Sequence, residues 1–521
     1  MRSWQTKLCI LVFWPGAHGP ALIIHAMLIK AGAVSLGLLI ASRLLGLLRE
    51  SALAATFGTS GLADVAVLML SLPDWVAGVL ASGALSYGLL PAWSRQGPAQ
   101  VAATQRRVAG LLLLAGFALA TALIIGRAAA VPVLAPGLPA GVHGAAMQAL
   151  VWSAMAIPAA LIASLWATRL QHERDFVGMY FGSLLVNLVL IAAIFTASAS
   201  IGGADPVLRL GIGLLLAGGA RLAWLHWRHR PVLPHDADRV VPDLPASAVW
   251  LWAVLSASLP LALPFAARSI ASGSGEGALA TFNYAWKLVE LPLLLAIQLV
   301  ATLSFPGIAR ALAVTGASGS LAGDRPIRTA FALAFALGCG AAAGLLAGAP
   351  AMAQLLFGWG RMEPEALARV AEWGRIAAWG LLPQALIAVA LTVLAAQGRM
   401  RAAVIAYGVA LAALLGAALA GNIGGAALMM ILNILLAGVA AVSVAAMGRP
   451  ALASLPWRVV LSASAALLLV AFLRSMFPAP RELLPGLAQA AVCAALVLAA
   501  AWLGAAELRR EPSHNSNAPN D

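Results

Sequence analysis

Charged residues are scarce in this sequence. Asp, Glu, Lys and Arg together make up 10% of its 521 residues, whereas 62% are hydrophobic and the mean hydropathy is +0.93. Soluble globular domains carry about 25% charged residues. This composition therefore excludes a soluble globular protein and predicts an integral membrane protein.

Cysteines and catalytic motifs are also scarce. The three cysteines Cys9, Cys339 and Cys493 lie far apart, so neither a disulfide framework nor a cysteine metal site is expected. The histidines between positions 226 and 235 lie on a basic, proline-rich stretch without thiol partners, which favours solvated loop histidines over a metal site. No Ser/His/Asp set, HExxH motif or P-loop appears. We expect no metal and no cofactor.

Long apolar runs are abundant and recur from one end of the chain to the other. Runs of about 18 or more residues are long enough to cross about 30 Å of hydrocarbon as helices. The sequence thus predicts an all-α polytopic membrane protein with about 14 transmembrane helices. Hydropathy places these spans at roughly 31–48, 64–91, 107–129, 146–170, 176–198, 206–226, 248–270, 278–306, 327–349, 374–396, 402–421, 424–447, 456–477 and 483–504.

The formal net charge of +13 does not indicate a nucleic-acid-binding protein, because Lys and Arg are scattered between the apolar runs instead of forming one basic domain. With a cytoplasmic N-terminus, the inner loops hold about 20 Lys and Arg and the outer loops about 9. Positive loops stay on the cytoplasmic side of the membrane. Both termini are therefore expected to be cytoplasmic.

Three landmarks recur in the same order, which indicates two related halves. Chance similarity in a Leu-rich chain is the alternative, but the common offset of about 220 residues favours a duplication. Six spans separate equivalent points, so both halves share one orientation, as in transporters with parallel repeats. The pairs are Leu72-Pro73 with Leu291-Pro292, PAWSR at 91–95 with PGIAR at 306–310, and QHER at 171–174 with QGRMR at 397–401.

The longest polar connection follows the sixth predicted span and separates the two halves. The polar C-terminal end is expected to be disordered, and Met27 is a candidate translation start just before the first good helix. The expected divisions are an N-terminal extension at 1–26, an N-lobe at 27–226, a cytoplasmic linker at 227–247, a C-lobe at 248–447, two extra helices at 448–506 and a tail at 507–521.

Charged residues within the apolar runs are the candidate functional residues, since a charge in hydrocarbon is kept where it faces a polar interior. Arg43 and Arg49 lie about 120° apart on one helix and can line a broad cavity, and guanidinium groups suit phosphate. Alternatively, Arg49 extends to the interface and pairs with Glu50. Asp64 is either a cavity residue or an N-cap of the helix that it begins, and Asp74 lies deeper in the same span.

The second half carries its own cation. Lys287 and Glu290 are three residues apart on one helix face, so they either neutralise each other or leave Lys287 to face the cavity across from Arg43.

Prolines and glycines mark places where two spans are expected to bend. Pro73 removes a backbone donor from the second span, and Gly78 and Gly83 follow it. Pro292 occupies the corresponding place in the second half, next to Leu291.

With these residues in place, the sequence resembles the MurJ/MviN lipid II flippases of the multidrug/oligosaccharidyl-lipid/polysaccharide exporter superfamily. The resemblance covers about residues 27–505, and its first block is fairly specific. The motifs that carry it are SRLLGLLRE at 42–50, FG at 57–58, AD at 63–64, LP at 72–73, SGALS at 82–86, KLVELP at 287–292, FPGIAR at 305–310 and LLFGWGRM at 355–362.

The resemblance implies two six-helix lobes and two additional C-terminal helices around a central cationic cavity that opens alternately to each side. In such flippases the pyrophosphate and sugar-peptide head of lipid II pass through the cavity while the polyprenyl tail stays in lipid. Arg43, Arg49, Asp64 and Lys287 match family cavity positions, with Lys287 in place of the usual Arg.

The sequence departs from the family pattern after its first Leu-Pro motif. Where the family commonly carries Arg residues and a Glu, this chain has Ala77, Gly78 and Ser82. These losses leave open which lipid-linked glycan is moved.

The sequence is therefore interpreted as a flippase that moves an undecaprenyl-pyrophosphate-linked saccharide, with lipid II as the first candidate, to the outer leaflet of the bacterial inner membrane. Expected partners are this lipid and the bilayer, with the protein a monomer. Without a hydrolysis motif, the drive would come from a monovalent ion or the membrane potential, which supplies about 2.3 kcal/mol per charge at 100 mV.

Other functions remain open. A flippase for another lipid-linked polysaccharide unit is one alternative. A polymerase or ligase acting on lipid-linked sugars usually needs a sizeable external loop, and the richest outer stretch, 361–375, is short. A drug antiporter would need a net acidic cavity, against which Arg43 and Arg49 argue.

Overall fold

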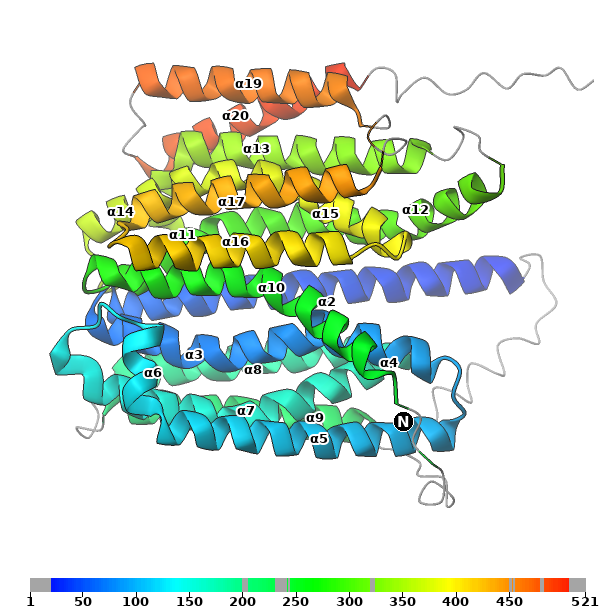
Figure 1. The fold of residues 1–521 in the computed structure, drawn as a ribbon. Helices are drawn as coiled ribbons and strands as arrows, with labels where there is room; N and C mark the ends of the chain where they lie inside the picture. The colour runs from blue at the N-terminus through cyan, green and yellow to red at the C-terminus, as the bar shows by residue number, and fades with distance from the viewer. Residues whose placement is uncertain are drawn as a thin grey trace, which may run out of the picture.

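The computed structural model describes residues 20–198, 205–229, 241, 244–318, 324–448, 452, 455–477 and 482–505. Throughout these residues the chain is built from helices and short connections, with no β-strand (Figure 1). The all-α prediction is confirmed. Residues 1–19 of the expected extension, 230–240 of the expected linker and the expected tail at 507–521 lie outside the described residues.

In the described part of the chain, 13 helical segments are long and apolar enough to cross a membrane. Each overlaps one of the spans predicted from hydropathy. The remaining predicted span, 31–48, lies inside a helix of 38 residues that begins earlier, at Pro20. The prediction of a polytopic helical membrane protein is confirmed.

The helices from α2 to α9 form a first group, coloured blue to green-cyan in the lower part of Figure 1. Within it α7 packs against α3, α5 and α9, and α8 packs against α2 and α9. The buried Ser153 hydroxyl of α7 donates to the carbonyl of Met69 in α3 at 2.6 Å. The elements are α2 (Pro20–Phe57), α3 (Gly61–Val79), η2 (Leu80–Ala84), α4 (Leu85–Trp93), α5 (Pro98–Ile125), α6 (Arg127–Leu134), η3 (Ala140–Val142), α7 (His143–His172), α8 (Phe176–Ser198) and α9 (Pro206–His229).

The helices from α10 to α17 form a second group, in which α13 packs against α15, and α16 against α10 and α17. The elements are α10 (Ser247–Ala271), η5 (Ser272–Ser274), α11 (Ala278–Pro292), η6 (Leu293–Ile297), α12 (Gln298–Ser318), α13 (Asp324–Phe357), α14 (Pro364–Ala377), η8 (Ala378–Gly380), α15 (Leu381–Ala396), α16 (Arg401–Ala420) and α17 (Gly425–Ala446).

The last two helices, α19 (Trp457–Met476) and α20 (Leu483–Gly504), lie against α13 at the top of Figure 1. Small residues of α13 allow this close approach. A Cβ atom at Gly340 would lie 3.0 Å from Leu498 of α20, and one at Gly344 would lie 3.5 Å from the carbonyl of Ala490.

A π-helical turn interrupts a long helix at a similar place in each half. The first, η2, separates α3 from α4 and contains Gly83, and the second, η6, follows Pro292 directly and separates α11 from α12. Such turns distort the helical hydrogen-bond ladder and are frequent at functional sites. The breaks lie near the predicted bends, and movement about them stays a prediction.

Glycines near the first π-helical turn face α10. A Cβ atom at these positions would come within 3.0 to 3.4 Å of α10 side chains, so the absent side chains let the two groups approach closely along this helix. The pairs are Gly78 with Leu261, Gly83 with Ala257, and Gly88 with Trp250.

Candidate functional site

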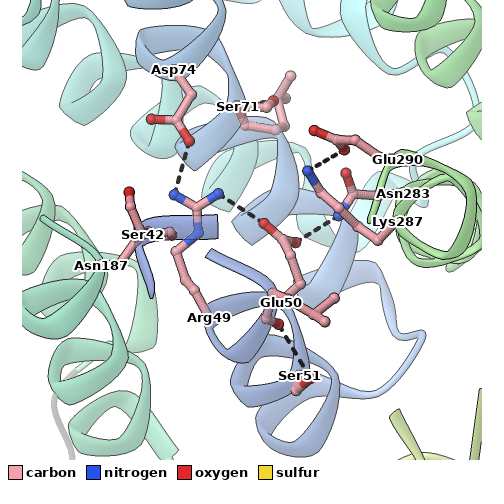
Figure 2. A network of polar contacts seen from close by, with 12 residues as sticks. Ser42, Arg49, Glu50, Ser51, Ser71, Asp74, Asn187, Asn283, Lys287 and Glu290 are labelled. Carbon is pink, nitrogen blue, oxygen red and sulfur yellow. Dashed lines mark hydrogen bonds and ion pairs between the residues drawn. The ribbon is translucent and has the colours of Figure 1, made fainter. Parts of the chain in front are cut away.

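A network of charged side chains lies between the two helix groups, with Arg49 of α2 near its centre (Figure 2). Arg49 donates from Nη2 to Oε1 of Glu50 and from Nη1 to Oδ2 of Asp74 on α3, both at 2.8 Å. The Arg49 side chain is only 11% exposed. Arg49 therefore pairs with Glu50, as one alternative held, but points into the protein and also binds a second helix.

The network crosses from the first group to the second through Asn283 of α11. Its Nδ2 donates to Oε2 of Glu50 at 2.7 Å, and its Oδ1 accepts from Nη1 of Arg268 on α10 at 3.2 Å. Asn283 and Glu50 are both buried. A continuous chain of charge-assisted hydrogen bonds thus joins α2, α11 and α10, and such bonds are stronger than those between neutral groups.

Lys287 lies one turn further along α11 and donates to Oε2 of Glu290 at 2.6 Å. Both side chains are partly exposed, at 24% and 27%. Lys287 also interacts electrostatically with Glu50 of the first group. The i,i+3 pair expected as an alternative is present, and Lys287 remains close enough to the first group to act with Arg49.

Arg43 lies apart from this network. Its side chain is exposed on α2 and interacts electrostatically with Tyr180 of α8. In the described part of the chain, Lys287 interacts with the Glu50 and Glu290 carboxylates and not with the neighbourhood of Arg43. The structure brings Lys287 together with Arg49 and Glu50, and the role predicted for Arg43 stays a prediction.

Asp64 caps a helix of the opposite half. Its carboxylate is fully buried and accepts from the backbone N–H groups of Gly277 and Ala280, both at 2.8 Å. These amides begin α11, where a helix leaves N–H groups unsatisfied. Its own helix α3 has Ser60 as its N-cap. The alternative that Asp64 caps its own helix is therefore wrong, because tertiary packing supplies a distant helix end, and its predicted cavity role stays a prediction.

Glu276 makes the reciprocal contact. Its Oε1 accepts from the N–H of Gly61, the first residue of α3, at 2.8 Å. The sequence did not indicate this contact, because Glu276 lies in the glycine-rich segment GSGEG at 273–277, whose pattern predicts only a loop. The adjacent Gly277 has φ +76°, and a Cβ atom there would collide with the carbonyl of Thr59, so this position requires glycine.

Two cations of this region were missed at the sequence level. Arg268 lies over the ring of Phe265 at 4.9 Å and belongs to the network. Arg221 of α9 interacts electrostatically with Asp74, and its buried Nε has no hydrogen-bond partner among the described residues. Both lie inside predicted spans, so the rule that singled out Arg43 would also have found them.

The network and Arg221 together carry an excess of positive charge. Their four cations, Arg49, Arg221, Arg268 and Lys287, face the three carboxylates Glu50, Asp74 and Glu290. The described residues contain no group of three or more His, Cys, Asp or Glu side chains placed to hold a metal ion. The arrangement suits an anionic ligand bound by guanidinium and ammonium groups.

Comparison with known proteins decides the family. The family described as "Lipid II flippase MurJ" matches residues 53–506 of this chain. The chain belongs to the MurJ family. The resemblance drawn from the sequence motifs is confirmed, and the family is one of transporters, as expected in place of an enzyme.

Two relatives are described as "Probable lipid II flippase MurJ". The protein of Rhizobium meliloti (strain 1021) is 27% identical over 358 residues, which is 65% of each chain. That of Rhizobium tropici is 26% identical over 303 residues, which is 54% of this chain and 55% of the other. The chain thus spans just under two thirds of the length of the first of these relatives.

Solved structures support the fold. A "Lipid II flippase MurJ, inward closed conformation" matches with a TM-score of 0.72 at 15% identity and covers 90% of this chain and 98% of its own. An inward-facing multidrug resistance MATE family transporter of the MOP superfamily matches with a TM-score of 0.57 at 13% identity, over 78% of this chain and 92% of its own. At these identities the likeness confirms the MurJ fold and says nothing further about this chain.

Proposed function

We propose that this protein is a flippase for an undecaprenyl-pyrophosphate-linked saccharide, lipid II, which it moves from the inner to the outer leaflet by alternating access. The observation that carries the proposal is the chain of contacts from Arg49 through Glu50 and Asn283 to Arg268, which joins both helix groups within apolar helices of a MurJ family member. Charges placed there without partners in lipid would be costly.

The chemistry of the site suits a diphosphate. A guanidinium group binds phosphate oxygens through two parallel N–H donors. In the absence of substrate, carboxylates neutralise these cations and spare them the cost of isolated burial. Asp74 is the most exposed of these carboxylates, at 50%, so it is the one that a diphosphate would most easily displace from Arg49.

Transport would use the division into an N-lobe at 27–226, a C-lobe at 248–447 and two extra helices at 448–506. The contacts of Asp64 and Glu276 close one end of the interface between the lobes. Rocking of the lobes would break these contacts and open that end. Pro73, Gly78, Gly83 and Pro292 lie in or beside the interrupted helices that would absorb the bend.

The same proposal includes the location of the protein, its orientation in the membrane and its energy source. It is a monomer in the bacterial inner membrane with both termini in the cytoplasm, and the closed end of the lobe interface faces outward. The drive comes from the membrane potential or a monovalent ion, since moving one charge through 100 mV supplies about 2.3 kcal/mol.

Reconstituted proteoliposomes test the function directly. Fluorescent lipid II is placed in both leaflets, and its exposure to an external quencher is followed in time. Wild type is expected to speed translocation, and Arg49→Ala to slow it at least about tenfold, because a charge-assisted hydrogen bond contributes about 1.5–3 kcal/mol. Arg369→Ala is the matched control, since Arg369 is an exposed arginine of α14 outside the network.

The outcome separates the alternatives. No acceleration by wild type would refute the flippase proposal for lipid II, and faster movement of a different lipid-linked saccharide would reassign the substrate. Formation of a glycan polymer from lipid II would point instead to a polymerase.

A further inference from the structure

A second cavity, separate from the charged network, lies between α19 and the second helix group. Its volume is about 710 Å³, and it is bounded by α13, α14, α15, α17 and α19. Most of its wall is apolar, with Trp379, Leu382, Ile434 and Ala471 among the lining residues. This volume lies within the range of about 300–1,000 Å³ common for ligand sites.

Two arginines line this cavity and give it positive charge. Arg375 lies in the last turn of α14, and Arg474 lies in the last turn of α19. No ion pair joins either one to a carboxylate among the described residues. Arg474 donates from Nη1 to the carbonyl of Phe477 at 2.9 Å, but its Nε is buried without a hydrogen-bond partner in the described part.

The occupant must reach this cavity from the bilayer. Met430 and Ile434 line the cavity and are 56% and 64% exposed, and both lie on α17, which is long and apolar enough to span the membrane. Hydrocarbon chains therefore have access to the apolar wall, and a phosphate group supplies the acceptors that two guanidinium groups need. A lipid with a phosphate group therefore fits the cavity, with its hydrocarbon chain on the apolar wall and its phosphate at the two arginines.

We propose that this groove binds an anionic phospholipid of the membrane, with its phosphate between Arg375 and Arg474 and an acyl chain along Trp379 and Ile434. Arg474 lies in the last turn of α19, and Arg375 lies in the last turn of α14. The end of α19 and the helix α14 are at the left of Figure 1. With the predicted orientation this is the outer leaflet. A zwitterionic lipid is disfavoured because its own cation repels the arginines.

Lipid titration of the full-length protein in detergent, followed by native mass spectrometry, tests the proposal. The probes are phosphatidylglycerol and phosphatidylcholine with identical acyl chains. Wild type is expected to bind phosphatidylglycerol at least about tenfold more tightly, because phosphatidylcholine carries a cation that the two arginines repel. The double variant Arg375→Gln/Arg474→Gln should lose this preference, whereas Arg458→Gln, at the opposite end of α19, should keep it.

A second variant tests the apolar part of the groove without changing its charge. Ala437 lines the cavity and is exposed, so Ala437→Trp should fill it and weaken binding of both lipids at least about threefold. Thermal unfolding of each variant in the same detergent verifies that it is folded.

Three results would overturn the proposal: equal binding of both lipids to wild type, unchanged phosphatidylglycerol binding in the double variant, or displacement of phosphatidylglycerol by undecaprenyl phosphate at equal or lower concentration. The last result would assign the groove to the transported lipid. None of these readouts depends on lipid II translocation, so the two proposals stand or fall separately.

Discussion

At the scale of single residues, the charges inside the apolar helices are held in partnerships. Arg49 binds Glu50 and Asp74, and Lys287 binds Glu290. Removing one member of a buried pair leaves an uncompensated charge, which costs more than removing both. The pairs therefore make stability and transport separable by mutation.

The pair on α11 shows this separation. Glu290→Gln should lower the free energy of unfolding by about 1 kcal/mol, a value reduced by the partial exposure of both side chains. The double variant Lys287→Met/Glu290→Gln should recover that stability and still fail to flip lipid II. Thermal unfolding and the proteoliposome assay measure the two effects. Equal stability of Glu290→Gln and wild type would show that the Lys287–Glu290 pair does not contribute to the free energy of unfolding.

The two unanticipated cations give a second prediction. Arg221→Ala and Arg268→Ala should each slow translocation about tenfold or more, since each removes a donor placed for phosphate. Arg268→Lys should retain part of the activity, because the charge remains without the planar fork. Wild-type rates in both alanine variants would remove these residues from the substrate path.

Sequence reasoning identified part of this site. Arg49 and Lys287 were predicted because intramembrane charge is a strong signal, whereas Asn283 and Glu276 were not, because an uncharged amide or a loop acid carries no such signal. The partner of Asp64 was also not predictable: its amides lie at positions 277 and 280, and only the fold brings them close.

At the scale of helices, α3 and α11 begin against each other, and each receives an acid from the opposite half. Glu276 binds the first amide of α3, and Asp64 binds the first amides of α11. A carboxylate at a helix N-terminus is favoured both by the free N–H groups and by the helix dipole. These contacts should stabilise the closed form of this end.

Asp64→Asn should weaken that closure, because an amide oxygen lacks the charge of the carboxylate. We expect a loss of about 1–2 kcal/mol in unfolding free energy, typical of a lost helix cap. With spin labels at positions 141 and 363 in a cysteine-free background, double electron–electron resonance should give a longer or broader distance distribution for Asp64→Asn than for the protein with Asp64. An unchanged distribution would mean that other contacts hold this end closed.

Glycine is required at one point of this junction. Gly277→Ala should destabilise the protein by about 2 kcal/mol or more, since the residue has positive φ and its Cβ would meet the carbonyl of Thr59. Gly141→Ala is the control, because a Cβ there has open space. Thermal unfolding compares them, and similar melting temperatures would contradict the steric argument.

At the scale of the whole molecule, composition and hydropathy predicted the fold class and the position of the spans, because lipid demands long apolar helices. They did not predict the internal breaks. The span expected at 64–91 is divided into α3, η2 and α4, and the one at 278–306 is divided by η6. Pro73, Gly83 and Pro292 indicated bends near these interruptions, but hydropathy alone does not register such residues.

The orientation of the molecule is open to direct measurement. A membrane-impermeant maleimide applied to spheroplasts should label Glu363→Cys, in the connection between α13 and α14, and should not label Val241→Cys until the membrane is permeabilised. Both positions are exposed in the structure. The positive-inside bias gives this expectation, and the reverse pattern would invert the proposed topology.

The reciprocal contacts of Asp64 and Glu276 mean that this end of the lobe interface can open only if both contacts break. If the halves part there, the amides of Gly61, Gly277 and Ala280 lose their acceptors in the same event, and each unsatisfied group costs about 1–3 kcal/mol until water arrives. Partly open states are not stabilised, because a slight separation already breaks all three of these hydrogen bonds. Opening of this end should accordingly be all-or-none. A substrate whose binding free energy is smaller than the cost of breaking all three hydrogen bonds should leave the end closed.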